Sequence, residues 1–272
     1  MKKKIIIIII IIFLITSFLY LWARYIENSG LIVKEYKITS SVSDNFHGLK
    51  IVHFSDLHYE SIDKNELKKI VNKINFINPD IVVFTGDLVN NSSKNSEIIN
   101  ELSQIQAKIG KFAVNGDNDI VEFDNIMSDS GFTVLNNSFE LIYNNGYESI
   151  IIAGITSSLK DTTSVSEKLK STYEYLEENS AIYKILLTHE PDIIDKTNIF
   201  DLVLAGHSHN SQINLPIIRD FTKLEGSKKY YLPYYKLNNT DLYISGGIGT
   251  LNYKLRFNNK PSINFYRIVK GS

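Results

Sequence analysis

Short apolar runs alternate with amphipathic stretches along the chain from Gly48 onward. Residues 65–78 and 96–109 repeat apolar side chains at helical spacing, and residues 165–177 indicate a further helix. The intervening apolar runs have the length of buried strands and lie at residues 49–55, 81–85, 112–114, 150–153, 185–187 and 202–205. The last third of the chain has strand-like runs at 242–245, 255–257 and 263–268. This alternation predicts an α/β fold with buried strands.

The amino terminus follows a different pattern. Residues 5–23 carry no charge, and a helix of that length, at about 1.5 Å per residue, approaches the ~30 Å hydrocarbon thickness of a bilayer. Lysines at positions 2–4 precede this run, so the positive-inside rule predicts a cytoplasmic tail at residues 1–4 and the rest of the chain outside. A cleaved signal peptide is the alternative, but its apolar region is usually shorter and is followed by small residues.

These patterns predict a single-pass protein of the cell membrane. Residues 5–23 form its uncleaved transmembrane anchor, residues 24–47 a polar, partly extended connector, and residues 48–272 one catalytic domain on the extracytoplasmic side. The 29 basic and 30 acidic residues give a net charge of -1, which provides none of the basic excess expected of a nucleic-acid binder. The absence of cysteine excludes disulfides, zinc–thiolate sites and cysteine nucleophiles.

Carboxylates and imidazoles follow five of the predicted strands. In an open α/β sheet, ligands bind beyond the carboxyl ends of the strands, so side chains placed there are expected to converge. A single histidine of this kind is more often structural, but four of the six histidines and several aspartates share this placement. Seven of these side chains form a ligand set suited to two ions: Asp56, His58, Asp87, Asp117, His189, His207 and His209.

These residues, in this order, resemble the motifs of the calcineurin-like metallophosphoesterase family. The family's D-x-H, G-D, G-N-H-D/E, lone H and G-H-x-H motifs stand here as Asp56-Leu57-His58, Gly86-Asp87, Gly116-Asp117-Asn118-Asp119, His189 and Gly206-His207-Ser208-His209. The start of the first motif and residues 206–213 also resemble a membrane-anchored bacterial branch of the family. The resemblance implies a metallophosphoesterase-type sandwich of two mixed β-sheets flanked by helices, here preceded by one transmembrane helix.

The resemblance also implies a role for each ligand. Two divalent ions (Mn, Fe, Zn, Ni or Co) would be bound, the first by Asp56, His58 and His209, the second by Asp117, His189 and His207. Asp87 would bridge both ions. A hydroxide held between them would attack the phosphorus of a phosphate ester or pyrophosphate.

The third motif departs from the family pattern at two positions. Asp117 replaces the family's asparagine and remains an oxygen ligand, whereas Asn118 replaces a histidine thought to protonate the leaving group. Asparagine donates a hydrogen bond but no proton, and general acid catalysis typically contributes roughly 10²–10⁴-fold. Either the substrate has a good leaving group, or another acid (Asp119 or His53) substitutes, or activity is weak. Asn118 and Asp119 are the candidate catalytic residues.

The sequence thus predicts a metal-dependent phosphohydrolase. Because residues 5–23 tether the catalytic domain to the membrane, a lipid-linked or cell-envelope-linked phosphate ester or pyrophosphate is the expected substrate. The alternative is a metal-binding family member with weak catalysis that serves as a sensor or scaffold. A nuclease is disfavoured by the charge balance and by the tether, and no nucleic-acid partner is expected.

Overall fold

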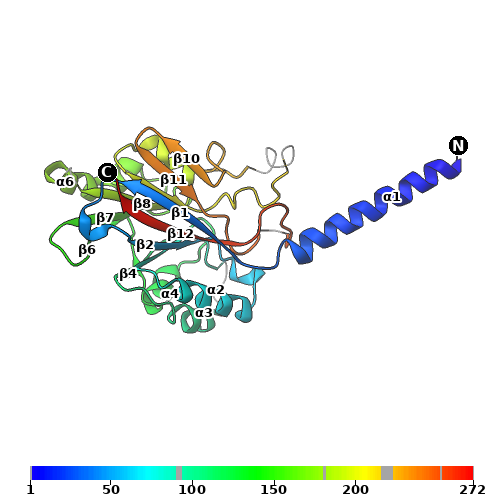
Figure 1. Cartoon of the computed structure of the whole chain (residues 1–272), viewed down its shortest axis with the longest axis horizontal. Helices are drawn as coiled ribbons and strands as arrows, with labels where there is room; N and C mark the ends of the chain where they lie inside the picture. The colour runs from blue at the N-terminus through cyan, green and yellow to red at the C-terminus, as the bar shows by residue number, and fades with distance from the viewer. Residues whose placement is uncertain (1, 90–93, 180–181, 216–222, 252, 272) are drawn as a thin grey trace.

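The computed structural model describes residues 2–89, 94–179, 182–215, 223–251 and 253–271 (Figure 1). Its α-helices are α1 (Lys2–Leu21), α2 (Lys64–Ile77), α3 (Asn95–Leu102), α4 (Phe123–Asp129), α5 (Val165–Lys168) and α6 (Lys170–Glu178). Short π- or 3₁₀-helical turns are η1 (Trp22–Ile26), η2 (Asp44–Phe46), η3 (Tyr59–Ser61) and η5 (Pro191–Lys196). The strands are β1 (Ile32–Ser40), β2 (Lys50–Phe54), β3 (Ile81–Thr85), β4 (Gly110–Val114), β5 (Thr133–Val134), β6 (Ser138–Tyr143), β7 (Ser149–Gly154), β8 (Tyr183–Thr188), β9 (Leu202–Ala205), β10 (Tyr234–Leu237), β11 (Thr240–Ile244) and β12 (Ser262–Lys270).

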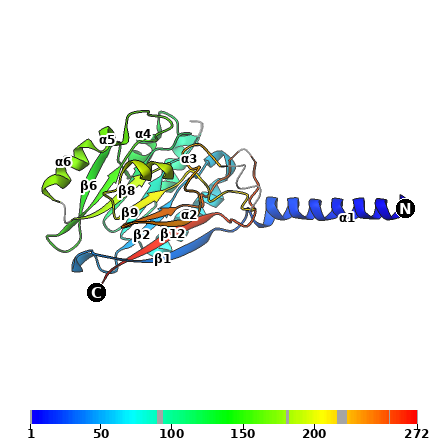
Figure 2. The same cartoon turned by 90° about the horizontal axis from the view of Figure 1, so that it is seen from above.

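The strands form two six-stranded sheets, which pack face to face with helices outside them (Figures 1 and 2). The first sheet has the order β1-β12-β2-β3-β4-β5 and the second β10-β11-β9-β8-β7-β6. Both are mixed, because β12 runs antiparallel to β2 in the first, and β10 and β6 run antiparallel to their neighbours in the second. The predicted sandwich of two mixed sheets flanked by helices is therefore confirmed.

Central strands are apolar on both faces because each face is covered. In β3, Ile81 and Val83 lie in the core between the two sheets, whereas Val82 and Phe84 lie in the core beneath α2, α3 and α4. Successive strand side chains point to opposite faces, so a short continuous apolar run fills two cores. The second sheet repeats this arrangement, with its outer face covered by α5, α6 and η5.

Helix α2 (Lys64–Ile77) agrees with the predicted helix at 65–78 to within one residue at each end. Asp63 and Glu66 form a capping box, and Leu67, Ile70, Val71 and Ile74 are buried against the first sheet. Helix α3 ends at Leu102, earlier than the predicted 96–109 helix. Beyond it the chain turns back to the sheet, where the amides of Lys108 and Ile109 donate to the carbonyls of Pro79 and Asp80.

Two further segments differ from the sequence-based expectation. The predicted connector contains β1, which pairs with β12 along its whole length, so the folded body begins before Gly48. The predicted strand at 255–257 is not formed, and Phe257 makes only an isolated bridge with Ile213. The reason is that the amide of Arg256 donates to the carbonyl of Ala23 at the end of the amino-terminal helix.

The amino-terminal helix projects from the sandwich (Figure 1). Lys2–Ile26 is the one segment, within the described residues, that is long and apolar enough to cross a membrane. Side chains from Ile5 to Ile15 are at least half exposed because nothing in the folded body covers them. This geometry matches the anchor predicted at residues 5–23, although a signal sequence passes the same test of length and composition.

Candidate metal centre

The two sheets deliver their polar side chains to one shared edge. Asp56 and His58 follow β2, Asp87 follows β3, and Asp117 follows β4, all from the first sheet. The second sheet supplies imidazoles, because His189 follows β8 and both His207 and His209 follow β9. Strands β2, β3 and β4 are parallel to one another, as are β8 and β9, so their carboxyl ends meet.

Four of the predicted ligands converge in one group: Asp87, Asp117, His189 and His207. The carboxylate Oδ1 of Asp117 lies 3.2 Å from Nε2 of His189 and 3.2 Å from Nδ1 of His207. Those two ring nitrogens are themselves 3.2 Å apart. The arrangement offers one carboxylate oxygen and two imidazole nitrogens to a common point.

The other three form a second, adjacent group: Asp56, His58 and His209. The Nε2 atoms of His58 and His209 are 3.3 Å apart, and Nε2 of His209 lies 3.4 Å from Oδ1 of Asp56. Asp87 lies between the groups, because its Oδ2 is 3.4 Å from Nε2 of His58 and 3.4 Å from Nε2 of His189. All seven predicted ligands are therefore brought together, with Asp87 shared.

The donor atoms suit divalent cations. Nδ1 of His189 lies 2.6 Å from the carbonyl of Thr85, and Nε2 of His207 lies 2.6 Å from the carbonyl of Glu225. A carbonyl only accepts, so these nitrogens carry hydrogens, and the opposite nitrogens are the ones that would present lone pairs to a bound metal ion in place of a proton. Oδ1 of Asp117 is buried and has no hydrogen-bond partner among the described residues. Facing lone pairs and an unpartnered carboxylate oxygen fit a metal ion between them.

The pKa values of the predicted ligands also indicate that the site favours positive charge. Burial alone would raise the pKa of Asp87, but the His189 imidazolium and the His58 charge hold that pKa well below its usual range. Burial lowers the pKa of His189, yet the Asp87 and Asp117 carboxylates outweigh it and raise the pKa well above the ordinary value. The carboxylates thus draw positive charge into the space that metal ions would fill.

Within the described residues, positive φ at residues other than glycine and asparagine occurs at this edge. Five of the seven predicted ligands have positive φ: Asp56, His58, Asp87, His207 and His209. Each non-glycine residue in this region costs of order 1–3 kcal/mol, and such strain concentrates at functional sites. Gly86 also has positive φ, and a Cβ there would lie 2.6 Å from Nδ1 of His189. Glycine at this position therefore allows the two sheets to meet.

Asn118 and Asp119, the candidate catalytic residues, both contact the shared carboxylate or its loop. The side-chain amide of Asn118 donates to Oδ2 of Asp87 at 2.9 Å. The carboxylate of Asp119 accepts from the amides of Asp87, Leu88, Val89 and Gly116. Burial and the Asp87 carboxylate raise the pKa of Asp119 to about 7, against the lowering effect of the Gly116 and Leu88 amides. Because its oxygens face backbone donors, this geometry favours a positioning role for Asp119.

His53, the other candidate acid, is a strand residue. It is fully buried in β2, between the hydroxyl of Tyr266 at 3.2 Å and that of Thr85 at 2.8 Å. Burial lowers its pKa to about 3, so the imidazole is neutral at physiological pH. A neutral imidazole packed inside the sandwich supports the core and does not reach the edge where the ligands converge.

Sequence reasoning assigned no role to Arg256, which is fully buried beside the centre. Its guanidinium donates to the carbonyls of Gly246, Gly249 and Asn259, and no carboxylate within the described part of the chain bonds it. The amides of Ile248 and Gly249 in turn donate to the carbonyl of Asp56. Arg256 thereby holds the glycine-rich turn, residues 246–249, against the predicted ligand Asp56. The sequence feature that could have indicated a role for Arg256 is its position between two apolar residues, shortly after the glycines of this turn.

A two-sheet sandwich with aspartates and histidines at its strand ends defines the class of metallophosphoesterases. The family model of the calcineurin-like phosphoesterases matches residues 49–211, and the chain belongs to that family. The predicted family is therefore confirmed, and with it membership of a hydrolase family that binds divalent metals.

Curated relatives extend the match beyond the family model. The chain is 31% identical over 265 residues to the uncharacterized metallophosphoesterase YkuE of Bacillus subtilis, covering 92% of this chain and 89% of that one. It is 25% identical over 247 residues to the UDP-2,3-diacylglucosamine pyrophosphatase LpxG of Chlamydia trachomatis, covering 72% and 74%. It is also 24% identical to a transmembrane protein with metallophosphoesterase domain of Danio rerio, over 81% of this chain and 53% of that one.

Proposed function

We propose that this protein is a membrane-tethered, binuclear metal-dependent phosphohydrolase. Its substrate is a phosphate ester or pyrophosphate linked to a lipid or to the cell envelope. The observation that carries this proposal is the placement of Asp87 between two ligand groups, with Oδ2 3.4 Å from a histidine of each. A carboxylate shared in this way suits two ions, one held by each group.

Two divalent ions bound at these groups would supply Lewis-acid stabilisation of the phosphoryl charge and a nucleophile derived from water. The chain's own residues orient the ligands for that chemistry. Thr85 and Glu225 fix the tautomers of His189 and His207 through their carbonyls, and Asn118 orients both oxygens of Asp87. A cavity of about 300 Å³, lined among others by His58, Asn118, Thr250 and Lys254, opens onto the site and admits the substrate.

Asn118 narrows the class of substrate. It carries no titratable proton, and its amide donates to Asp87, so it does not protonate a leaving group. A substrate with a good leaving group, such as a nucleotide or another phosphate, needs little protonation. Cleavage of a pyrophosphate bond therefore suits this site better than cleavage of an alkyl ester. The name of the Chlamydia relative, a pyrophosphatase of a diacylated sugar nucleotide, agrees with this choice.

The catalytic domain lies outside the cytoplasm in this proposal. Lys2, Lys3 and Lys4 precede the apolar helix, and basic residues at that end favour a cytoplasmic amino terminus. The sandwich would then meet substrates at the extracytoplasmic surface of the cell membrane, through the anchor at residues 5–23. Protease protection of the sandwich in intact cells, compared with permeabilised cells, tests this orientation.

A metal-binding sensor or scaffold with weak catalysis is the second candidate, and Asn118 is the observation that favours it. The test uses the full chain in detergent, loaded with Mn²⁺, and 4-nitrophenyl phosphodiesters as substrate. Hydrolysis above the metal blank that disappears in Asp87→Ala supports the phosphohydrolase. Bound metal without hydrolysis would support the scaffold and contradict the enzyme.

A further inference from the structure

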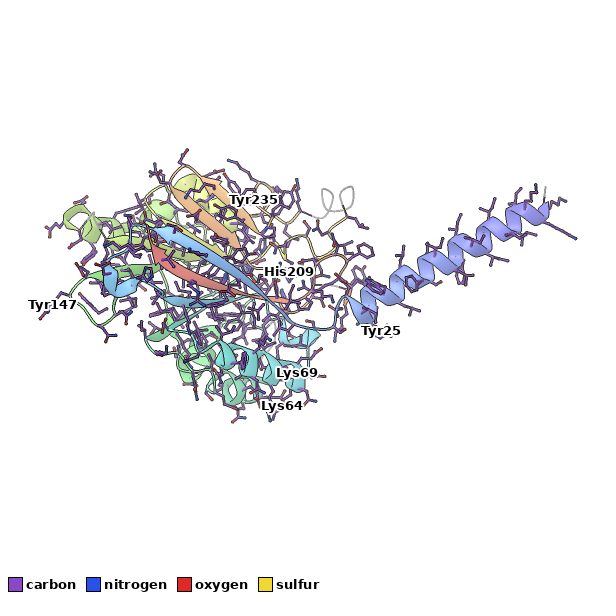
Figure 3. All side chains as sticks on the ribbon, in the orientation of Figure 1. Tyr25, Lys64, Lys69, Tyr147, His209 and Tyr235 are labelled. Atoms are coloured by element: carbon purple, nitrogen blue, oxygen red, sulfur yellow. The ribbon has the colours of Figure 1, made fainter. Side chains whose placement is uncertain are left out.

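The metal centre and the membrane anchor lie at the same end of the sandwich. Strand β1 follows the anchor and runs parallel to β12, whereas β12 runs antiparallel to β2. The carboxyl end of β2, which bears Asp56 and His58, therefore lies beside the amino end of β1, where the chain leaves the anchor. Figure 3 shows Tyr25 at the base of α1 and Tyr147 at the far end of the body.

Hydrogen bonds join the anchor's end to the rim of the site. The amide of Arg256 donates to the carbonyl of Ala23 at 3.2 Å, and the Arg24 guanidinium donates to the carbonyl of Lys254 at 3.3 Å. Ala23 is buried by this contact. Tyr25 and Tyr253 stay 62% and 72% exposed, on the anchor and on the rim, where aromatic rings suit a bilayer interface. The rim is thus joined to the base of the proposed anchor.

A second cavity lies between the anchor's exit and the site. It has a volume of about 170 Å³ and an apolar wall formed by Leu31, Ile62, Ile70 and Ile248. Its polar lining includes Lys69 and Glu66 of α2 and residues 28–30 just beyond the anchor. Lys69, labelled in Figure 3, is on the side of the body facing α1. We call this space the anchor-side cavity.

The anchor-side cavity adjoins the opening of the metal centre. Ser61 and Thr250 line both spaces, and the amide of Thr250 donates to the hydroxyl of Ser61 at 2.9 Å. The hydrogen-bonded pair Ser61 and Thr250 therefore lies at the boundary between the two cavities. A molecule with its phosphate at the metal ligands places its next few atoms at this boundary, with an apolar wall beyond it.

We propose that the anchor-side cavity holds the first part of an alkyl or acyl chain of the substrate, while the rest of that chain stays in the bilayer. This deepens the proposed function and rests on it: the substrate is an amphiphilic phosphate ester drawn from the membrane that carries the anchor. The occupant is an aliphatic chain because the wall is aliphatic, the cavity is narrow, and it adjoins both the membrane surface and the phosphate site.

The test is a homologous series of alkyl 4-nitrophenyl phosphates, from methyl through butyl and octyl to dodecyl. The full chain is placed in lipid nanodiscs with Mn²⁺. Water adds its oxygen to phosphorus, the aryl P–O bond breaks, and alkyl phosphate and 4-nitrophenolate are released. A buried methylene contributes up to about fourfold, so kcat/KM is expected to rise with chain length and then level off once the cavity is filled.

Two variants fill the cavity and one control fills another hollow. Ile62→Trp and Leu31→Trp are expected to bring the octyl-to-methyl ratio of kcat/KM well below the wild-type ratio. Ile199→Trp fills an apolar hollow beside Tyr173 and Leu176, away from the site, and is expected to keep the wild-type ratio. The ratio within each variant cancels general losses of folded protein, and comparison of that ratio with the wild-type ratio cancels the partition of each substrate into lipid.

The outcomes separate the two proposals. A flat series in the wild type, or a ratio that survives both tryptophan variants, overturns the cavity proposal and leaves the phosphohydrolase intact. If no member of the series is hydrolysed above the metal blank, the proposed function fails. The cavity is then tested by competition of methyl phosphate and dodecyl phosphate for the Mn²⁺-loaded chain, where equal affinity overturns it and a preference lost in Ile62→Trp supports it.

Discussion

The side-chain amide of Asn118 donates to Oδ2 of Asp87 at 2.9 Å, and its backbone amide donates to Oδ1 at 3.0 Å. A residue in the place of the family's proton donor thus orients the carboxylate that both ligand groups share. Asn118 therefore affects both the geometry of the shared carboxylate and the range of leaving groups that the site can expel.

Asn118→His is expected to restore a proton donor. For a substrate with an alkyl leaving group, kcat should rise by up to about 10²-fold, since general acids contribute roughly 10²–10⁴-fold. For a 4-nitrophenyl ester, whose leaving group needs no proton, the change should be small. The measurement is kcat for both substrates in both proteins. An equal change on the two substrates would show that the histidine acts by another route.

Gly86→Ala tests the close approach of the two sheets. Gly86 has φ +90°, and a Cβ there would lie 2.6 Å from Nδ1 of His189. Gly48 has nearly the same φ, +88°, with nothing within 4 Å, so Gly48→Ala is the matched control. The control is expected to cost about 1–2 kcal/mol of stability and to keep bound metal. Gly86→Ala should lose metal as well, and equal metal content in the two variants would contradict the steric argument.

Arg256→Gln tests the support of the glycine-rich turn. Three carbonyls lose their donors, and unsatisfied buried groups cost about 1–3 kcal/mol each, so a loss of about 3 kcal/mol in unfolding free energy is expected. The affinity for one of two ions should also fall, because the turn supports Asp56. Arg256→Lys keeps the charge and should recover part of both losses. Unchanged metal affinity in Arg256→Gln would limit Arg256 to a purely structural role.

The low pKa of His53 predicts that the free energy of unfolding falls in acid. Its folded-state pKa is about 3, below the ordinary 6.5, so only the unfolded state binds the proton between these values. Stability therefore falls as pH drops below 6.5, by up to about 1.4 kcal/mol per pH unit. His53→Gln removes that proton site. Urea unfolding of the metal-free proteins between pH 4 and 7 should show a difference that shrinks with falling pH, and a constant difference would contradict the assignment.

The strands and ligands were predicted best where a short apolar run in the sequence is also a buried strand in the fold. Ile81–Phe84 is apolar because both faces of β3 are covered. Asp87 comes just after the carboxyl end of that strand, where the ligands meet. Ordered motifs therefore placed all seven ligands at one edge. Their assignment to particular ions stays a prediction.

Other features depend on contacts between distant parts of the chain. Residues 32–40 are only moderately apolar, and they become β1 because β12, more than 200 residues later, offers an edge. Residues 255–257 look like a strand, but Arg256 bonds the anchor's end and the glycine-rich turn instead. The backbone carbonyls of Thr85 and Glu225 accept hydrogen bonds from His189 and His207, and a pattern of side chains cannot predict such backbone contacts.

The most direct test is the manganese content and magnetic state of the full chain. We expect about two Mn²⁺ per wild-type chain with an exchange-coupled spectrum in electron paramagnetic resonance, because one carboxylate bridging two ions holds them about 3.5–4 Å apart. Asp117→Ala should keep about one ion with an uncoupled spectrum, since the Asp56 group remains. A wild-type chain that binds one ion or none, or two ions without coupling, would contradict a shared Asp87.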